Sequence, residues 1–224
     1  MRTLLLNGTD IPYDLPIEKL NAMLSSSDMK EFSLACEALS YNSDDVAYQL
    51  MKSHINDKDK YRRLYILKTI FRHPQATELI DYLERSISSG DFLFVENGLL
   101  VVKEHKIKVS STLLLSAVKK HLSKLSTSLG ALSIIEPSLD NYNELLTLFE
   151  ASTKCVQKEI LAEVLIDKFV QIKSRELFTL FSKNSFAKIR LLSIKIAMDY
   201  EYDLSIFSED ADGHIRNAIK NLNR

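Results

Sequence analysis

The chain has 224 residues, 46% of them hydrophobic, so it can bury a substantial core and is not expected to be disordered. It has only five glycines and four prolines, too few for β-sandwiches, β-barrels or glycine-rich phosphate loops. A net charge of −1 gives no overall attraction for nucleic acid or for an anionic membrane. These bounds predict a helical, soluble protein.

Residues 1–27 differ in pattern from the rest of the chain. Residues 4–6 and 11–13 are mostly apolar and flank the turn-forming residues 7–10, which predicts a small hairpin or an extended segment. Residues 16–24 predict one helix. We expect this N-terminal segment to cap the apolar face of the first helices that follow. Its apolar run is too short for a signal peptide, and no run in the chain approaches the roughly 18 residues of a membrane span.

Helix-start signals recur through residues 28–224 at intervals of about 26 to 34 residues. They lie near Asp28, Asp57 to Asp59, Asp91, Ser123, Thr153, Ser185 and Asp212. Each interval splits into two patterns with apolar residues at i, i+3, i+4 and i+7. The clearest first helices are expected at residues 32–39, 61–67, 156–165 and 189–197, and the shorter second helices at 44–55, 75–87, 111–122, 142–151 and 175–181.

Individual residues refine this pattern. Pro74 opens the helix expected at 75–87, where its missing N–H costs nothing. Pro137 ends the preceding helix, and Asp140 is placed to cap the next. A small residue lies near the middle of several apolar stripes, where stacked helices need a close approach: Ala35, Gly98, Gly130, Ala162, Ser193 and Ala218.

The pattern resembles the HEAT-repeat family, in particular its short repeats of about 30 residues whose first helix begins with an acidic residue, then a β-branched or aromatic residue and Arg. The residues that carry this resemblance are 59–63 (Asp-Lys-Tyr-Arg-Arg), 188–190 (Lys-Ile-Arg) and 212–218 (Asp-Gly-His-Ile-Arg-Asn-Ala). The repeats at 91–122 and 123–152 lack the Arg. The resemblance implies that the Asp caps the helix and that the Arg bonds a neighbouring repeat. It also implies an all-α fold, a right-handed α-α superhelix (solenoid) of about six short helical pairs, as a single domain over residues 28–224.

The chemistry-bearing residues form no recognisable site. Cys36 and Cys155 lie in apolar helical patterns without CxxC spacing, so buried free thiols are expected, with a disulfide as the alternative. The five histidines form no metal-binding motif, and the isolated glycines exclude phosphate loops and dinucleotide fingerprints. The acidic residues 208–212 match the start of a calcium loop only superficially, so helix capping is expected there. The sequence predicts no catalytic residue, metal or cofactor. It predicts a cytoplasmic protein that is not an enzyme.

Positive charge is concentrated in one stretch. Residues 57–124 carry a net charge of +5, whereas residues 1–56, 125–182 and 183–224 carry −4, −3 and +1. The stretch is either a solvated helix face, with local acids such as Asp57 and Asp59 as partners, or a docking patch for an acidic protein or a nucleic-acid backbone. The resemblance places second helices on the concave side, which singles out Lys119 and Lys120, with Tyr82 and Arg85 on the preceding second helix as an extension. These four are the predicted partner-binding residues.

The predicted function is a protein-interaction module or scaffold that presents an extended surface to a protein or peptide partner. The alternative is a nucleic-acid-binding or DNA-repair protein, because some relatives of the HEAT-like fold are DNA glycosylases that hold damaged DNA in a basic concave groove. This alternative fits less well, since the chain has no Trp and is nearly neutral. Other relatives are bilin lyases, but no residue here supports that chemistry.

Overall fold

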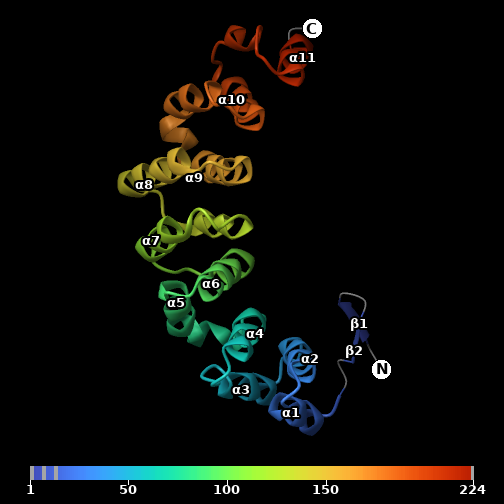
Figure 1. Cartoon of the computed structure of the whole chain (residues 1–224). Helices are drawn as coiled ribbons and strands as arrows, with labels where there is room; N and C mark the ends of the chain where they lie inside the picture. The colour runs from blue at the N-terminus through green and yellow to red at the C-terminus, as the bar shows by residue number, and fades with distance from the viewer. Residues whose placement is uncertain (1–2, 7–8, 13–14, 223–224) are drawn as a thin grey trace. The chain divides into compact units, whose positions relative to one another are not determined.

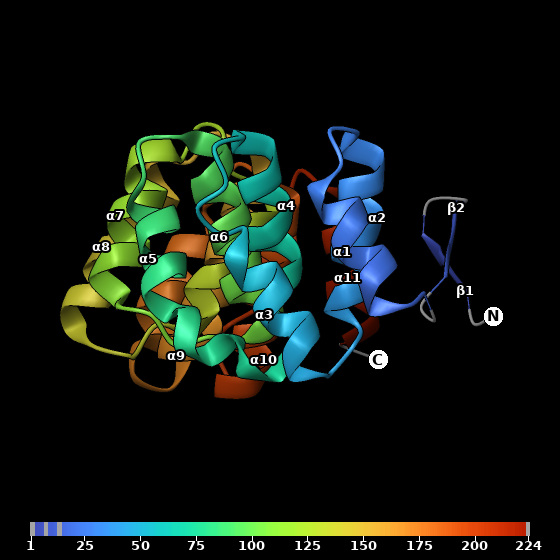
Figure 2. The same cartoon turned by 90° about the horizontal axis from the view of Figure 1, so that it is seen from below.

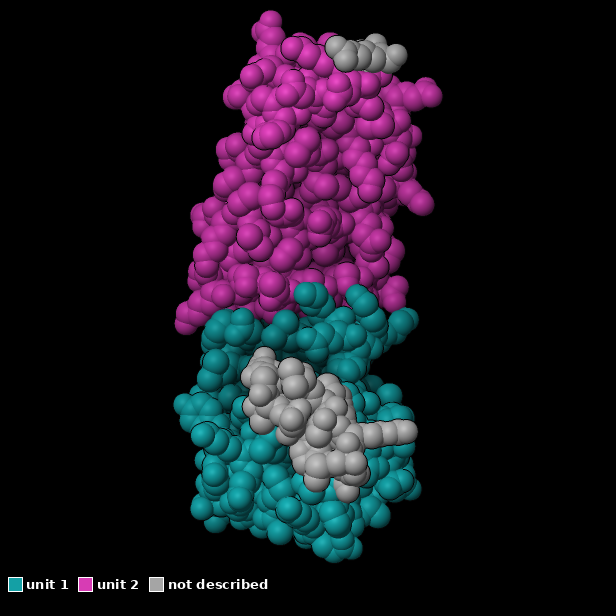
Figure 3. Space-filling view, turned by 90° about the vertical axis from the view of Figure 1, so that its right-hand side faces the viewer, with its two compact units in different colours: residues 1–117 teal, residues 118–224 magenta. Residues whose placement is uncertain are grey.

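The structure, a computed structural model, describes residues 3–6, 9–12 and 15–222 (Figure 1). Apart from one two-stranded hairpin, the regular elements of these residues are helices, which confirms the all-α class. None of the described helices is both long enough and apolar enough to cross a membrane. The chain divides into two compact units, residues 1–117 and 118–224, which have separate colours in Figure 3. The single repeat domain over 28–224, the number of helical pairs and their superhelix stay predictions.

The N-terminal hairpin pairs β1 (Thr3–Leu6) with the antiparallel strand β2 (Thr9–Pro12). The predicted hairpin is thus confirmed for these strands, whereas residues 7, 8 and 13 lie outside the described part of the chain. The helix expected at 16–24 is α1 (Ile17–Ser25), which packs on α2 (Met29–Ser40) and buries Leu20 and Leu24. The capping role of this segment stays a prediction.

The helices of unit 1 alternate between two rows (Figure 2). The first helices α2, α4 (Lys60–Ile70) and α6 (Phe92–His105) are neighbours, while the second helices α3 (Asp45–Ser53) and α5 (Ile80–Ser88) pack against them. The helix expected at 75–87 is divided, because a 3-10 helix, η1 (Pro74–Leu79), precedes α5. Pro74 opens it as predicted, and His73 Nδ1 accepts the N–H of Gln75 at 3.2 Å. The helix α7 (Ser111–His121) crosses the boundary between the units.

Unit 2 is organised around α9 (Cys155–Ser182), in which two helices are joined by a kink at Lys173. It packs against η2 (Thr127–Ile134), α8 (Leu139–Ala151) and α10 (Ala187–Tyr200). The helices expected at 156–165 and 175–181 both lie on α9, which departs from helical geometry at Lys173. The chain continues through η3 (Ser205–Phe207) to α11 (Gly213–Leu222), where Phe207, Ile215 and Ile219 form a small core with Ile194.

Two boundary predictions in unit 2 were wrong. The first helix of the repeat at 123–152 is only the 3-10 helix η2, which begins at Thr127 rather than near Ser123. The cap of α8 is Ser138, whose Oγ accepts the N–H of Asn141 at 3.2 Å, so Asp140 lies in the first turn instead of capping it. Ser and Thr are common in residues 123–133, and their hydroxyls compete with backbone hydrogen bonds of a regular α-helix.

The predicted acidic caps are confirmed at four helix starts. A side-chain oxygen of each accepts a backbone N–H of the first turn, which otherwise lacks an intrahelical partner. Asp28 accepts the N–H of Lys30 at 2.8 Å, and Asp59 accepts that of Tyr61 at 2.7 Å. Asp91 accepts the N–H of Leu93 at 3.0 Å, and Asp212 accepts that of His214 at 2.8 Å. The small residues Ala35, Ala162 and Ser193 have no exposed surface, as close helix contacts require.

Candidate functional site

A short polar motif recurs at the start of three of the described helices, and we call it the start motif. Its first residue is Asp or Asn, its second is the helix N-cap two positions later, and its third is an Arg six positions after the first. The copies are Asp57, Asp59 and Arg63; Asn184, Phe186 and Arg190; and Asp210, Asp212 and Arg216. The side chain of each first residue accepts the N–H of the second, at 2.8, 3.1 and 2.8 Å. This turn directs the backbone into the helix.

The Arg of each copy folds back onto its own loop. Arg63 Nη1 donates to the carbonyls of Asp57 and Lys58 at 2.5 and 3.1 Å. Arg190 Nη1 donates in the same way to Asn184 and Ser185 at 2.8 and 3.0 Å, and Arg216 Nη1 donates to Asp210. In every copy the guanidinium therefore binds the carbonyl six residues before it, and the loop is closed locally by a charge-assisted hydrogen bond.

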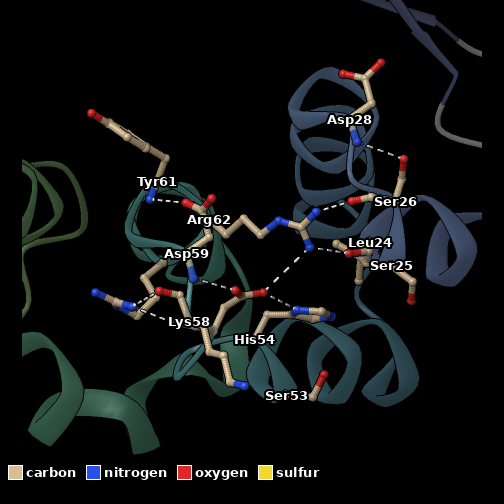
Figure 4. A network of polar contacts seen from close by, with 12 residues as sticks. Leu24, Ser25, Ser26, Asp28, Ser53, His54, Lys58, Asp59, Tyr61 and Arg62 are labelled. Atoms are coloured by element: carbon tan, nitrogen blue, oxygen red, sulfur yellow. Dashed lines mark hydrogen bonds and ion pairs between the residues drawn. The ribbon is translucent and has the colours of Figure 1, made fainter.

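Another Arg, Arg62, contacts the end of α1 (Figure 4). Its Nη1 donates to the carbonyl of Leu24 at 3.2 Å, and its Nη2 donates to the carbonyl of Ser26. These carbonyls lie at the C-terminal end of α1, where helix carbonyls lack intrahelical partners. The guanidinium also lies 4.6 Å from the ring centroid of Phe32. Arg62 therefore ties α4 to both α1 and α2.

Asp57 completes this network. Its Oδ2 is 3.2 Å from His54 Nδ1 and 3.7 Å from Arg62 Nη1. Burial alone would raise the pKa of Asp57, but the N–H of Asp59, His54 and Arg62 outweigh burial and hold that pKa below its usual 3.8. The carboxylate is therefore charged at neutral pH and serves the fold.

The second copy of the start motif carries a two-pronged ion pair. Arg190 Nε and Nη2 donate to Asp210 Oδ2 and Oδ1 at 2.7 and 2.8 Å, and the two side chains are only 13% and 7% exposed. Arg190 holds the pKa of Asp210 below its usual 3.8 despite the opposing effect of burial. This pair joins α10 to the loop that begins α11.

Acidic partners neutralise several cations of the basic stretch. Arg62 pairs with Asp57, Arg72 with Glu37, and Lys60 with Asp91 at 2.5 Å. These pairs support the interpretation of this charge as locally balanced. The balance is incomplete: across the described residues, neither Arg63 nor Arg85 lies within ion-pair distance of a carboxylate, and the exposed Lys68 and Lys120 also lack such a partner. Arg63 binds neutral carbonyls, and Arg85 Nε donates to the carbonyl of Asp81 at 3.2 Å.

Arg63 and Arg85 line one pocket of about 370 Å³ in unit 1. It lies among α4, α5, the loop after α5 and the start of α6, and its polar and aromatic lining includes Lys60, Tyr82, Asp91 and Phe94. Arg63 Cζ is 5.6 Å from the ring centroid of Phe94. Arg85 also lines a second, larger hollow of about 750 Å³, together with the acids Asp81 and Glu84.

Of the predicted partner-binding residues in unit 1, Arg85 is exposed but Tyr82 is not. Tyr82 is 7% exposed, and its hydroxyl donates to the carbonyl of Arg63 at 3.2 Å. Burial raises the pKa of Tyr82 to about 12, against the opposing influence of Arg63 and Arg85. Tyr82 therefore holds α5 to α4 and contributes to the wall of the pocket rather than to an exposed contact surface.

The other predicted residues, Lys119 and Lys120, belong to unit 2. Both are exposed on α7, whereas Val118 beside them is fully buried. Lys119 Nζ lies 3.5 Å from Glu144 Oε2 on α8. The four residues thus fall into two groups on different units, and a continuous surface between them stays a prediction.

The two cysteines differ in accessibility. Cys36 is fully buried as predicted, and burial raises the pKa of its thiol, whereas Cys155 is only half-buried at the first residue of α9. We expect a maleimide to label Cys155 in the native protein at least about a hundredfold faster than Cys36, because the thiol of Cys36 becomes accessible only when the protein unfolds. Intact-mass spectrometry of Cys36→Ala and Cys155→Ala variants measures each rate. Equal native rates would contradict the burial of Cys36.

Sequence reasoning missed the pocket, because Arg63 and Phe94 are 31 positions apart and meet only through packing. The start motif was detectable, since its Asp or Asn and its Arg recur at one spacing. In the described part of the chain, no three His, Cys, Asp or Glu side chains are grouped to hold a metal ion. No family model and no curated protein matches this sequence significantly.

Proposed function

We propose that this chain is a non-catalytic binding module built from HEAT-like helical repeats, about six pairs stacked as a right-handed superhelix, and that it holds a protein or peptide partner. The observation that carries this proposal is the start motif, which opens three helices with the same turn and the same back-bonded Arg. Recurrence of one structural solution along a chain is the mark of a repeat protein.

The distribution of polar side chains supports binding over catalysis. Several charged side chains serve the fold, because they hold loops and helices together: Arg62, Asp57, Arg190 and Asp210. The remaining unbalanced cations, such as Arg85 and Lys120, are exposed, where they can meet a partner. A reducing, cytoplasmic setting is part of this proposal, since both cysteines are free thiols.

A protein partner fits the surface better than nucleic acid does. Asp81 and Glu84 lie beside Arg85, and Glu144 pairs with Lys119. These carboxylates would repel a run of phosphates, whereas a protein segment of mixed charge can match them.

The test is capture of a partner by the tagged full chain from native extract, with and without nuclease, followed by a charge reversal. Lys119→Glu with Lys120→Glu should weaken binding of the identified partner about tenfold, mainly through slower association. The matched control is Lys183→Glu with Lys195→Glu, two exposed lysines of the same unit. Surface plasmon resonance gives both rates.

Two results would count against this prediction. Equal binding by both double variants would remove Lys119 and Lys120 from the contact surface. A nuclease-sensitive partner, with a salt dependence that flattens by about two units of slope in the variant, would favour the nucleic-acid alternative.

A further inference from the structure

We propose that the pocket around Arg63 and Arg85 in unit 1 binds an acidic side chain of a partner protein segment. This inference rests on the proposed function and names the chemistry of the partner at one site.

The first argument is the unbalanced charge. The described residues place no carboxylate at ion-pair distance from either guanidinium, although Arg62, Arg72 and Arg190 each have one. Arg63 is fixed by two carbonyls of its own loop and by the face of Phe94, so its charge has a set position. Lys60 and Asp91 also line the pocket, but they pair with each other at 2.5 Å, so the two guanidiniums remain as unbalanced like charges. Like charges repel each other, and a bound anion relieves that repulsion. An Arg held in place also loses little side-chain freedom when it binds a carboxylate.

The second argument is the size of the pocket and the side chains that line it. At about 370 Å³ the pocket lies at the low end of the range of small-molecule sites, which suits an amino-acid side chain. Phe94 offers an apolar wall for the methylene groups of an Asp or Glu, and the guanidinium of Arg85 keeps its terminal nitrogens available for the carboxylate.

The third argument is the adjoining acidic hollow, which selects protein over nucleic acid. Asp81, Glu84, Arg85 and Ser88 follow the i, i+3, i+4, i+7 spacing, so they form one stripe of α5. A segment with an acidic residue near a basic one would place the acid beside Arg85 and the base beside Asp81 and Glu84. A nucleic-acid backbone has no positive group for that hollow.

The experiment is an NMR titration of the 15N-labelled full chain with the peptide acetyl-Gly-Glu-Glu-Gly-Lys-Lys-Gly-amide. We expect saturable shifts of the amides of residues 85–94. Arg85→Gln should weaken binding about tenfold or more, because it removes a charged donor from the pocket. The control Lys68→Gln removes one exposed cation from α4 in the same unit and should change affinity less than about twofold.

Several outcomes would overturn the proposal: no saturable binding, shifts only outside residues 85–94, or equal losses in Arg85→Gln and Lys68→Gln. Tighter binding of single-stranded octathymidylate at the same amides would also overturn it, in favour of nucleic acid. A captured partner whose affinity is unchanged by Arg85→Gln but reduced by reversal of Lys119 and Lys120 would reject this pocket and leave the proposed function standing.

Discussion

Arg190→Met is expected to lower the free energy of unfolding by about 3 to 5 kcal/mol, because it leaves the carboxylate of Asp210 buried without its partner. It also removes the donor that closes the loop at Asn184. The control is Lys188→Met on the same helix. Lys188 Nζ lies 3.0 Å from Glu159, but its side chain is 63% exposed, so we expect a loss below about 1 kcal/mol. Urea unfolding measures both variants, and equal losses would show that the buried pair contributes no more than an exposed one.

The same pair gives a pH dependence with a defined sign. The pKa of Asp210 is lowered in the folded state, so its stabilisation is complete above the ordinary carboxyl pKa of 3.8 and is lost as the pH falls through the folded value. The difference in unfolding free energy between the wild type and Asp210→Asn should therefore be largest near neutral pH and shrink below about pH 4. A difference that stays constant down to pH 3 would contradict the charge interaction.

Gly98→Ala is expected to destabilise the protein by about 1 to 3 kcal/mol, although Ala favours a helix over Gly by about 1 kcal/mol. Gly98 lies on α6 where α5 crosses it, and a Cβ there would be 2.8 Å from Ile87 Cγ1 and 3.5 Å from its backbone nitrogen. Ile87 is branched at Cβ and buried, so its Cγ1 cannot move aside without cost.

Two comparisons isolate this contact in thermal or urea unfolding. Gly90→Ala should be nearly neutral, because no atom lies within 4 Å of an added Cβ at that position. In an Ile87→Ala background, which removes Cγ1, Gly98→Ala should lose most of its cost. If Gly98→Ala stabilised the wild-type protein, the close approach of α5 and α6 would be wrong.

Local sequence signals predicted most helices because their causes are local. An Asp before an apolar stripe specifies a helix start at Asp28, Asp59 and Asp91, whichever helices later pack against it. The helices expected at 156–165 and 175–181 lie on either side of the kink at Lys173 in α9, and no Gly or Pro in residues 166–174 separates them. The 3-10 geometry of η2 was not predictable from the spacing of apolar residues, because over so short a span a 3-10 helix and an α-helix give the same spacing.

The candidate site was predictable only in part. Arg85 was singled out by its place on a second helix, and it is exposed in the pocket. Tyr82 was chosen on the same ground, but its hydroxyl binds the carbonyl of Arg63, 19 positions away, and this long-range partner draws the ring into the core. No helical pattern encodes such a contact, because it depends on how α5 and α4 pack.

The local closure of the start motif has a consequence for how the chain folds. Each Arg binds a carbonyl only six residues before it, so the loop that must close is very short. Such contacts lower the mean sequence separation of native contacts, which favours rapid folding. Copies of the start motif lie in both halves of the sequence. We therefore expect folding to begin at more than one nucleus, with each helix start formed before the neighbouring helices pack against it.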